Sequence, residues 1–109
     1  MPITLSQDPS QFSLVRFICL TDDKFLTEAS WCPGLGTNRF AVTVANANPV
    51  YSQIYLKTRV FEISGRKVNT AMDTTSSGQN WHGGQIALPN GNVAQTDTIK
   101  IVRVLGYSL

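Results

Sequence analysis

The chain has 109 residues, of which 42% are hydrophobic and 15% charged, a composition that argues against disorder and leaves room for one domain with a modest core. Nine Lys and Arg residues against seven Asp and Glu leave a net charge of +2, without clusters of basic residues. We therefore expect no nucleic-acid binding and no attraction to acidic membranes.

The first predicted element is a helix over residues 9–20. Asp8 is a good N-cap and Pro9 suits the first helical position. Apolar residues then recur at helical spacing, at Phe12, Val15, Ile18 and Cys19. Leu14 and Phe17 make the opposite side of this helix apolar as well. A monomer would hardly cover such a helix, so we expect a partner there.

A strand is the alternative interpretation of the same segment. Its residues also separate into two alternating sets, Phe12, Leu14, Arg16 and Ile18 against Ser13, Val15, Phe17 and Cys19. The capping residues favour the helix. Because Arg16 interrupts the longest apolar run near the N-terminus, no transmembrane segment is predicted, and the first residues predict no secretory signal.

Beyond residue 24 the apolar pattern changes to a period of two, which is typical of half-buried antiparallel strands. It predicts about six strands, at 25–31, 39–46, 53–64, 66–72, 79–88 and 97–105. The turn at 89–92 contains Asn-Gly, the strongest short hairpin signal, and predicts that the strands on either side of it pair. The fold class is therefore mainly β, a single domain over 1–109 with an antiparallel β-sandwich over 24–109 and a short N-terminal α-helix.

Few side chains are available for an active site. His82 is the single histidine, and although the His-Gly-Gly that it begins resembles an oxyanion loop, no Gly-x-Ser-x-Gly elbow accompanies it. One histidine with Cys19 and Cys32 fits no zinc spacing, so we expect no metal and no cofactor. Asp22 and Asp23 are expected in a turn rather than as an acid–base pair. The sequence predicts a protein that is not an enzyme.

The two tryptophans and the two cysteines leave alternatives open. Trp31 and Trp81 each lie beside a glycine-rich loop, where an aromatic ring can stack on a sugar or anchor a protein partner. The alternative for each is a core residue that caps one end of the sandwich. Cys19 and Cys32 predict either one disulfide or two free thiols.

Four short motifs carry a resemblance to a known family. They are Ser13-Leu14-Val15-Arg16-Phe17, then Trp31 with Gly34 and Gly36, then Arg59-Val60-Phe61-Glu62-Ile63-Ser64-Gly65-Arg66, and finally Thr96-Asp97-Thr98-Ile99-Lys100-Ile101-Val102. In this order they resemble the fungal immunomodulatory proteins over about residues 13–104. The resemblance implies an immunoglobulin-like or fibronectin-III-like sandwich that dimerises through its N-terminal helix and an adjoining strand.

The resemblance also implies a function. Members of that family act outside the cell without a cleaved signal peptide, agglutinate blood cells, stimulate lymphocytes and in some cases bind glycans. We accordingly expect a homodimeric, lectin-like protein that binds a cell-surface glycan or receptor, with a cytoplasmic location as the alternative. The expected dimer interface consists of Phe12, Leu14, Val15, Phe17 and Ile18. The expected glycan site consists of Trp31, Thr37, Thr98 and Ile99, with Trp81 as a further candidate.

The chain departs from the family in ways that bear on sugar binding. It contains cysteines, its loop after Trp31 is longer by about two residues, and it stops at Leu109, before the family's C-terminal segment, whose final aromatic contributes to the sugar site. Two other function classes therefore stay open. One is a structural β protein such as a viral coat or tail component, and the other is a hydrolase centred on His82.

Overall fold

The computed structural model describes residues 3–48, 52–70, 73–74, 80–81, 83–88, 91–95 and 99–108. Within these ranges the chain consists of antiparallel strands and two 3₁₀ turns, with no α-helix, so the prediction of a mainly β protein is confirmed. The strands are β1 (Ile3–Thr4), β2 (Leu14–Thr21), β3 (Leu26–Trp31), β4 (Arg39–Asn48), β5 (Gln53–Ser64), β6 (Lys67–Thr70), β7 (Asp73–Thr74), β8 (Asn80–Trp81), β9 (Gly83–Leu88), β10 (Asn92–Gln95) and β11 (Ile99–Tyr107). The 3₁₀ turns are η1 (Pro9–Gln11) and η2 (Pro33–Leu35). None of the described residues belongs to a helix that could cross a membrane.

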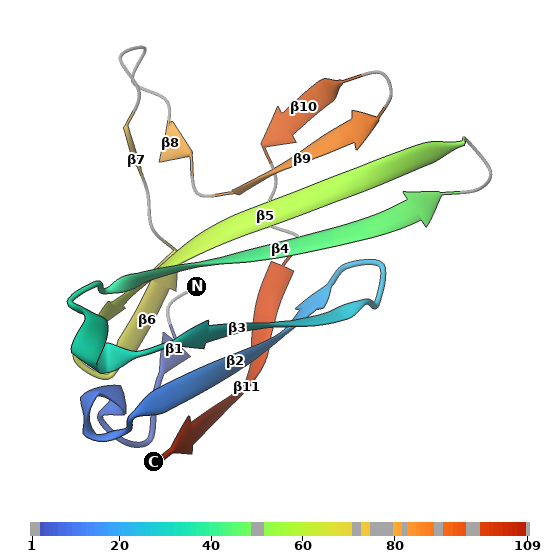
Figure 1. The fold of residues 1–109 in the computed structure, drawn as a ribbon. Helices are drawn as coiled ribbons and strands as arrows, with labels where there is room; N and C mark the ends of the chain where they lie inside the picture. Colours follow the sequence, from blue (N-terminus) through green and yellow to red (C-terminus); the bar gives the residue numbers. More distant parts are fainter. Residues whose placement is uncertain are drawn as a thin grey trace.

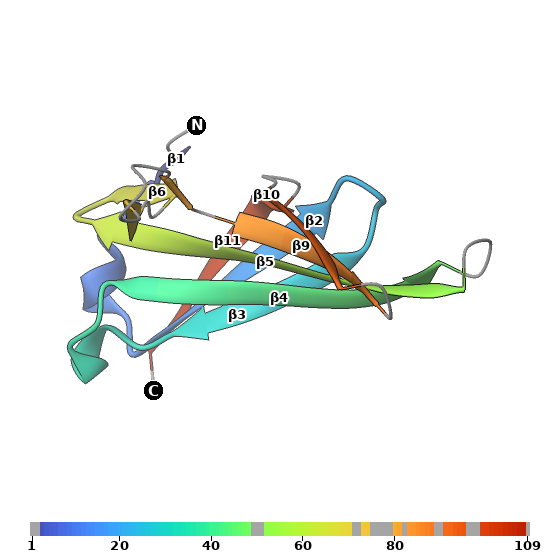
Figure 2. The same cartoon turned by 90° about the horizontal axis from the view of Figure 1, so that it is seen from above.

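The strands form two stacked sheets and a small ribbon. The larger sheet has the order β1-β6-β5-β9-β10, with β4 on the other edge of β5. The smaller sheet has the order β11-β2-β3, and β7 pairs with β8. Figure 1 shows β2, β3 and β11 below β4 and β5, and in the view from above these strands overlap (Figure 2). The protein is therefore a sandwich-like arrangement of two antiparallel sheets.

Aromatic contacts join the two sheets. The ring of Phe17, on β2, stacks on Phe40 of β4 with their centroids 4.1 Å apart, and Phe40 stacks in turn on Phe61 of β5 at 5.4 Å. Aliphatic side chains from both sheets surround this stack, namely Val15, Val42, Val44, Ile63, Val68 and Ile99. The core therefore lies between the sheets, where apolar side chains from both leave water.

The prediction of a helix over residues 9–20 is wrong. Asp8 does act as a cap, because its carboxylate accepts a hydrogen bond from the Ser10 amide at 2.9 Å, but the turn that it caps is only η1. From Leu14 onward the chain is strand β2, paired with β3 on one side and β11 on the other. Its odd-numbered residues from Val15 to Thr21 are buried and its even-numbered ones are half-exposed. The alternative interpretation as a strand describes this segment.

The spacing of apolar residues predicted a helix because helical spacing coincides in part with the alternation of a strand. Val15 and Cys19 are four positions apart, which places two residues on one side of a helix and also on one face of a strand. Local capping by Asp8 stabilises a single turn, whereas pairing along both edges of β2 satisfies the backbone of the whole segment. Tertiary pairing therefore decided the conformation.

The later strands follow the predicted pattern with one change of partner. The segment 53–64 is β5 as predicted, and β4 extends the predicted 39–46 to residue 48. The predicted strand 79–88 is divided into β8 and β9. The strand that returns along β9 is β10, however, whereas β11 crosses to the other sheet and pairs with β2. The predicted pairing of 79–88 with 97–105 is therefore wrong.

We expect Phe17→Ala to lower the free energy of unfolding by about 3–5 kcal/mol, because it removes the ring that joins the two sheets. Urea denaturation followed by tryptophan fluorescence measures this loss. Leu35→Ala is the matched control, since Leu35 is 76% exposed on η2 and its removal should change stability by less than about 0.5 kcal/mol. Equal effects of the two substitutions would contradict the proposed position of the core.

Candidate functional site

The surface of the smaller sheet that points away from the core is unusually apolar. On β2 this surface carries Leu14, Ile18 and Leu20, all partly exposed. The cross-strand partners of β2 extend it, because Leu26 on β3 pairs with Leu20 and is 70% exposed. We call this surface the outer face, and its apolar members are Leu14, Ile18, Leu20, Leu26, Leu105 and Tyr107.

Charged groups lie among and beside these apolar side chains. Arg16, on β2, donates a hydrogen bond to the Tyr107 hydroxyl at 3.1 Å and forms an ion pair with Glu28 of β3. Glu28 and Arg103 flank Ile18 from β3 and β11, so acid, apolar and basic side chains form one row across the sheet. Ion pairing satisfies Arg16 without covering the apolar residues.

The outer side of the larger sheet mixes polar and apolar residues. On its outer side Arg39 forms an ion pair with Glu62 at 3.2 Å, and the hydroxyls of Thr43 and Thr58 are 3.2 Å apart. An antiparallel sheet with one face on the core usually exposes such polar residues on the other face. Apolar residues interrupt this polar surface, because Leu56 and Val60 are half-buried and Ile54 is 50% exposed on the same side of β5. On the outer face of the smaller sheet, every outward residue of β2 except Arg16 is apolar. A contiguous apolar surface of this kind marks a contact site.

At one end of the sandwich a buried lysine replaces apolar packing. Lys57 of β5 is 5% exposed, and its ammonium group lies 3.0 Å from Asp22 Oδ1 and 3.1 Å from Asp23 Oδ2. Both aspartates belong to the turn between β2 and β3. Asp23 also accepts hydrogen bonds from Thr21 and Asn46. The carboxylates neutralise Lys57, so the cluster holds the turn against β5.

The environment of this cluster changes two pKa values. Partial burial alone would raise the pKa of Asp23, but the hydrogen bonds from Thr21 and Lys57 together with the lysine charge lower it below its ordinary value. Burial alone would lower the pKa of Lys57, but the hydrogen bonds to Asp22 and Asp23 and their charges raise it. Both groups are therefore charged at neutral pH.

Both cysteines are free thiols, so the possibility of a disulfide between Cys19 and Cys32 is excluded. Burial raises the pKa of Cys19 to about 11. Its thiolate is therefore scarce at neutral pH, and Cys19 behaves as a small apolar core residue.

The predicted glycan residues do not form a surface site among the described residues. Trp31 is 7% exposed and donates its indole N–H to the Thr37 carbonyl at 2.8 Å, so it belongs to the core as the alternative interpretation had it. Ile99 is buried in the same core, while Thr37 is exposed. Trp81 is placed by its backbone in β8. Thr98, the remaining glycan candidate, lies outside the described residues, as does His82, the centre of the hydrolase alternative.

The structure divides the predicted dimer residues between two surfaces. Val15 and Phe17 are buried in the core, so their assignment to an exposed interface is wrong and follows from the wrong helix. Leu14 and Ile18 lie on the outer face, as partners of Tyr107 and Glu28 in the neighbouring strands. Phe12 lies elsewhere, at the end of the sandwich beside η1.

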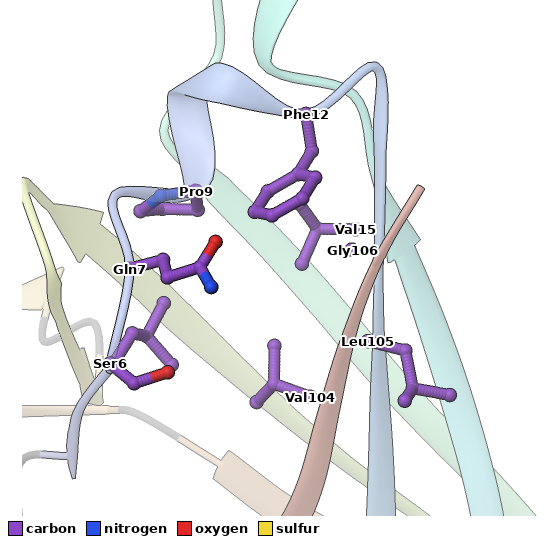
Figure 3. Close-up of a pocket in the computed structure, with 9 residues that line it drawn as sticks. Ser6, Gln7, Pro9, Phe12, Val15, Val104, Leu105 and Gly106 are labelled. Atoms are coloured by element: carbon purple, nitrogen blue, oxygen red, sulfur yellow. The ribbon is translucent and has the colours of Figure 1, made fainter. Parts of the chain in front are cut away.

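Phe12 forms part of a cavity of about 390 Å³ between the N-terminal segment and β11. Figure 3 shows Pro9, Phe12 and Val104 around it, while the Leu105 side chain points away from it. Gly106 is required here, because a Cβ atom at this position would lie 2.7 Å from the Phe12 ring. Sequence reasoning missed this contact, for which a glycine inside a strand is the only signal.

Comparison of the chain with protein-family models, curated protein sequences and solved structures gave no match. Of the surfaces described above, the outer face has apolar residues at three of the four outward positions of its central strand, Leu14, Ile18 and Leu20, with Arg16 as the fourth. It is our candidate functional site.

We expect Asp23→Asn to lower the free energy of unfolding by about 1 kcal/mol at neutral pH, because Lys57 loses one of its two carboxylates. The lowered pKa of Asp23 makes its contribution present above the unfolded-state pKa, and that contribution disappears as the pH falls through the folded-state value. The contribution from the raised pKa of Lys57 is lost instead as the pH rises through its folded-state value.

Urea titrations of the wild type and this variant between about pH 7 and pH 2 measure the effect, and the difference should narrow towards the acid end. Glu62→Gln, in the exposed pair with Arg39, is the control and should cost less than about 0.5 kcal/mol. A difference between wild type and Asp23→Asn that stays constant with pH would be inconsistent with this role of Asp23.

Gly106→Ala tests the contact with Phe12. At an unobstructed strand position this change would stabilise the protein, but here it should destabilise it by about 1–3 kcal/mol, because the added methyl group overlaps the Phe12 ring. In a Phe12→Ala background the same substitution should become neutral or stabilising. Unfolding free energies of the four proteins in this double-mutant cycle measure the coupling, and additive effects would rule the contact out.

Proposed function

We propose that this protein is a non-enzymatic binding protein that works as a homodimer joined through the outer face. The observation that carries the proposal is the apolar surface formed by Leu14, Ile18 and Leu20 on the solvent side of β2. Homodimer interfaces are more apolar than ordinary protein surface, and association would remove these side chains from water.

The predicted dimer is retained here on a different structural basis. A strand face replaces the helix, and Leu14 and Ile18 are the two predicted interface residues that this face contains. We give up stacking of a sugar on Trp31, because its indole is buried. A protein receptor is therefore the proposed external ligand. The immunoglobulin-like or fibronectin-III-like sandwich, the action on immune cells and the extracellular location stay predictions from the resemblance.

One observation favours the structural alternative, a coat or tail component. Among the described residues β4 pairs with β5 along all ten of its positions and with no strand on its other edge. Its segment 40–48 contains no charged residue and no proline, which are the usual protection of an edge strand. Pairing through this edge would extend the assembly beyond a dimer.

Ile18→Glu is expected to convert the dimer into folded monomers. The substitution would bury one carboxylate from each subunit at the centre of the interface, and we expect the dissociation constant to rise more than about 100-fold. Light scattering coupled to gel filtration measures the mass, and circular dichroism verifies the fold.

Ser64→Glu is the matched control, because Ser64 is exposed on the larger sheet and the same charge there should leave the dimer unchanged. A wild-type protein that is monomeric at millimolar concentration would refute the proposal. Particles larger than a dimer that Ala45→Lys disperses would instead favour the structural alternative, since Ala45 is an exposed residue of β4.

A further inference from the structure

The charges of the outer face are distributed unevenly between its two edges. Lys100 and Arg103 lie on β11, and both are exposed. Glu28 lies on β3, and its side chain is 51% exposed in spite of its ion pair with Arg16. One edge of the face is therefore basic and the other carries a carboxylate, with Arg16 and the apolar residues of β2 between them.

One row across the sheet contains both charges. Arg103 and Glu28 are each the cross-strand partner of Ile18, from opposite sides. Neighbouring strands lie about 4.8 Å apart, so the two charges are separated by roughly 10 Å with Ile18 midway. Rotation of this row by 180° about an axis parallel to β2 exchanges the positions of its basic end and its acidic end.

A twofold axis along β2 would use this exchange. It would stack β2 of one subunit on β2 of the other, and the basic edge of each subunit on the acidic edge of its neighbour. Arg16 would then face its own copy, and the ion pair of each Arg16 with Glu28 of its own subunit offsets this repulsion. Stacked sheets lie about 10 Å apart, a distance that an arginine and a glutamate reaching from both sides can bridge. The usual packing rotation of about 30° would displace the two groups by only about 3 Å along the strands.

A twofold axis across the strands would have the opposite effect. It would place β11 on β11 and β3 on β3. With the axis at the row of Ile18, Arg103 would face its own copy and Glu28 would face its own copy. Like charges that face each other across an interface are unfavourable. The charge distribution therefore distinguishes the two symmetric arrangements.

Resting on the homodimer proposed above, we infer that the two subunits are related by a twofold axis along β2, with Arg103 of each subunit paired with Glu28 of the other. Such an interface is isologous, and it sets Ile18 against Ile18 at its centre. Arg103 and Glu28 then determine the orientation of the subunits, while the apolar residues supply most of the affinity.

Cysteine cross-linking tests the axis. Leu14 and Leu20 lie about 20 Å apart along β2. An axis along β2 brings each of them close to its own copy, whereas an axis across the strands can do so for only one. In a Cys32→Ser background we expect a short bismaleimide, which can join thiols on two sheets about 10 Å apart, to cross-link Leu14→Cys and Leu20→Cys each into a covalent dimer. Ser64→Cys, on the larger sheet, is the control and should stay monomeric on denaturing gels.

Charge reversal tests the ion pairs. Arg103→Glu should weaken the dimer roughly tenfold, because two carboxylates would then meet at each end of the row. Glu28→Arg should weaken it in the same way through paired guanidinium groups. An equimolar mixture of these two variants should form heterodimers at least as tight as the wild-type dimer. Lys67→Glu, on β6 of the other sheet, is the control and should have no effect.

The outcomes separate this inference from the proposed function. If Ile18→Glu abolishes the dimer but only one of the two cysteine variants cross-links, or if the charge-reversed mixture stays dissociated, the axis along β2 is wrong and the homodimer stands. If the wild-type protein is monomeric at millimolar concentration, both proposals fail together.

Discussion

The stacking of Phe17 on Phe40 is the contact on which the rest of this structure depends. It joins β2, the central strand of the smaller sheet, to β4 of the larger one, and Phe61 continues the stack into β5. Because the side chains of a strand alternate between its two faces, the inward position of Phe17 fixes the direction of every other residue of β2. The same contact that builds the core therefore directs Ile18 and its neighbours outward.

This coupling explains why core and candidate site occupy one strand. Val15, Phe17 and Cys19 face the larger sheet, and the residues between them form the outer face. A slip of the register of β2 by one residue would exchange the two sets. Pairing with β3 and β11 on both edges prevents such a slip and places charged residues at either side of the apolar centre.

The two ends of the sandwich are closed by different chemistry. At the end where β2 turns into β3, a buried lysine and two aspartates fill the space between the sheets. At the other end the Trp31 indole, hydrogen-bonded to the Thr37 carbonyl, and the contact of Phe12 with Gly106 complete the apolar core. Polar closure of this kind costs desolvation, which the ion pairs of Lys57 offset. Trp31, which closes one end, is buried and so does not offer the exposed ring that a sugar platform needs.

By itself the sequence determined the mainly β character of the chain and the long strand β5, because a period of two is a local signal. The Asn-Gly pair correctly indicated a hairpin after β9, but its second strand is β10 and not 97–105 as predicted. The sequence also showed that the segment around Ile18 has too many apolar residues for one covered face. Only the tertiary structure decided that this segment is a strand, that β11 pairs with it, and that Arg103 and Glu28 flank Ile18. Those relations join residues far apart in the chain, and no local pattern encodes which strands become neighbours.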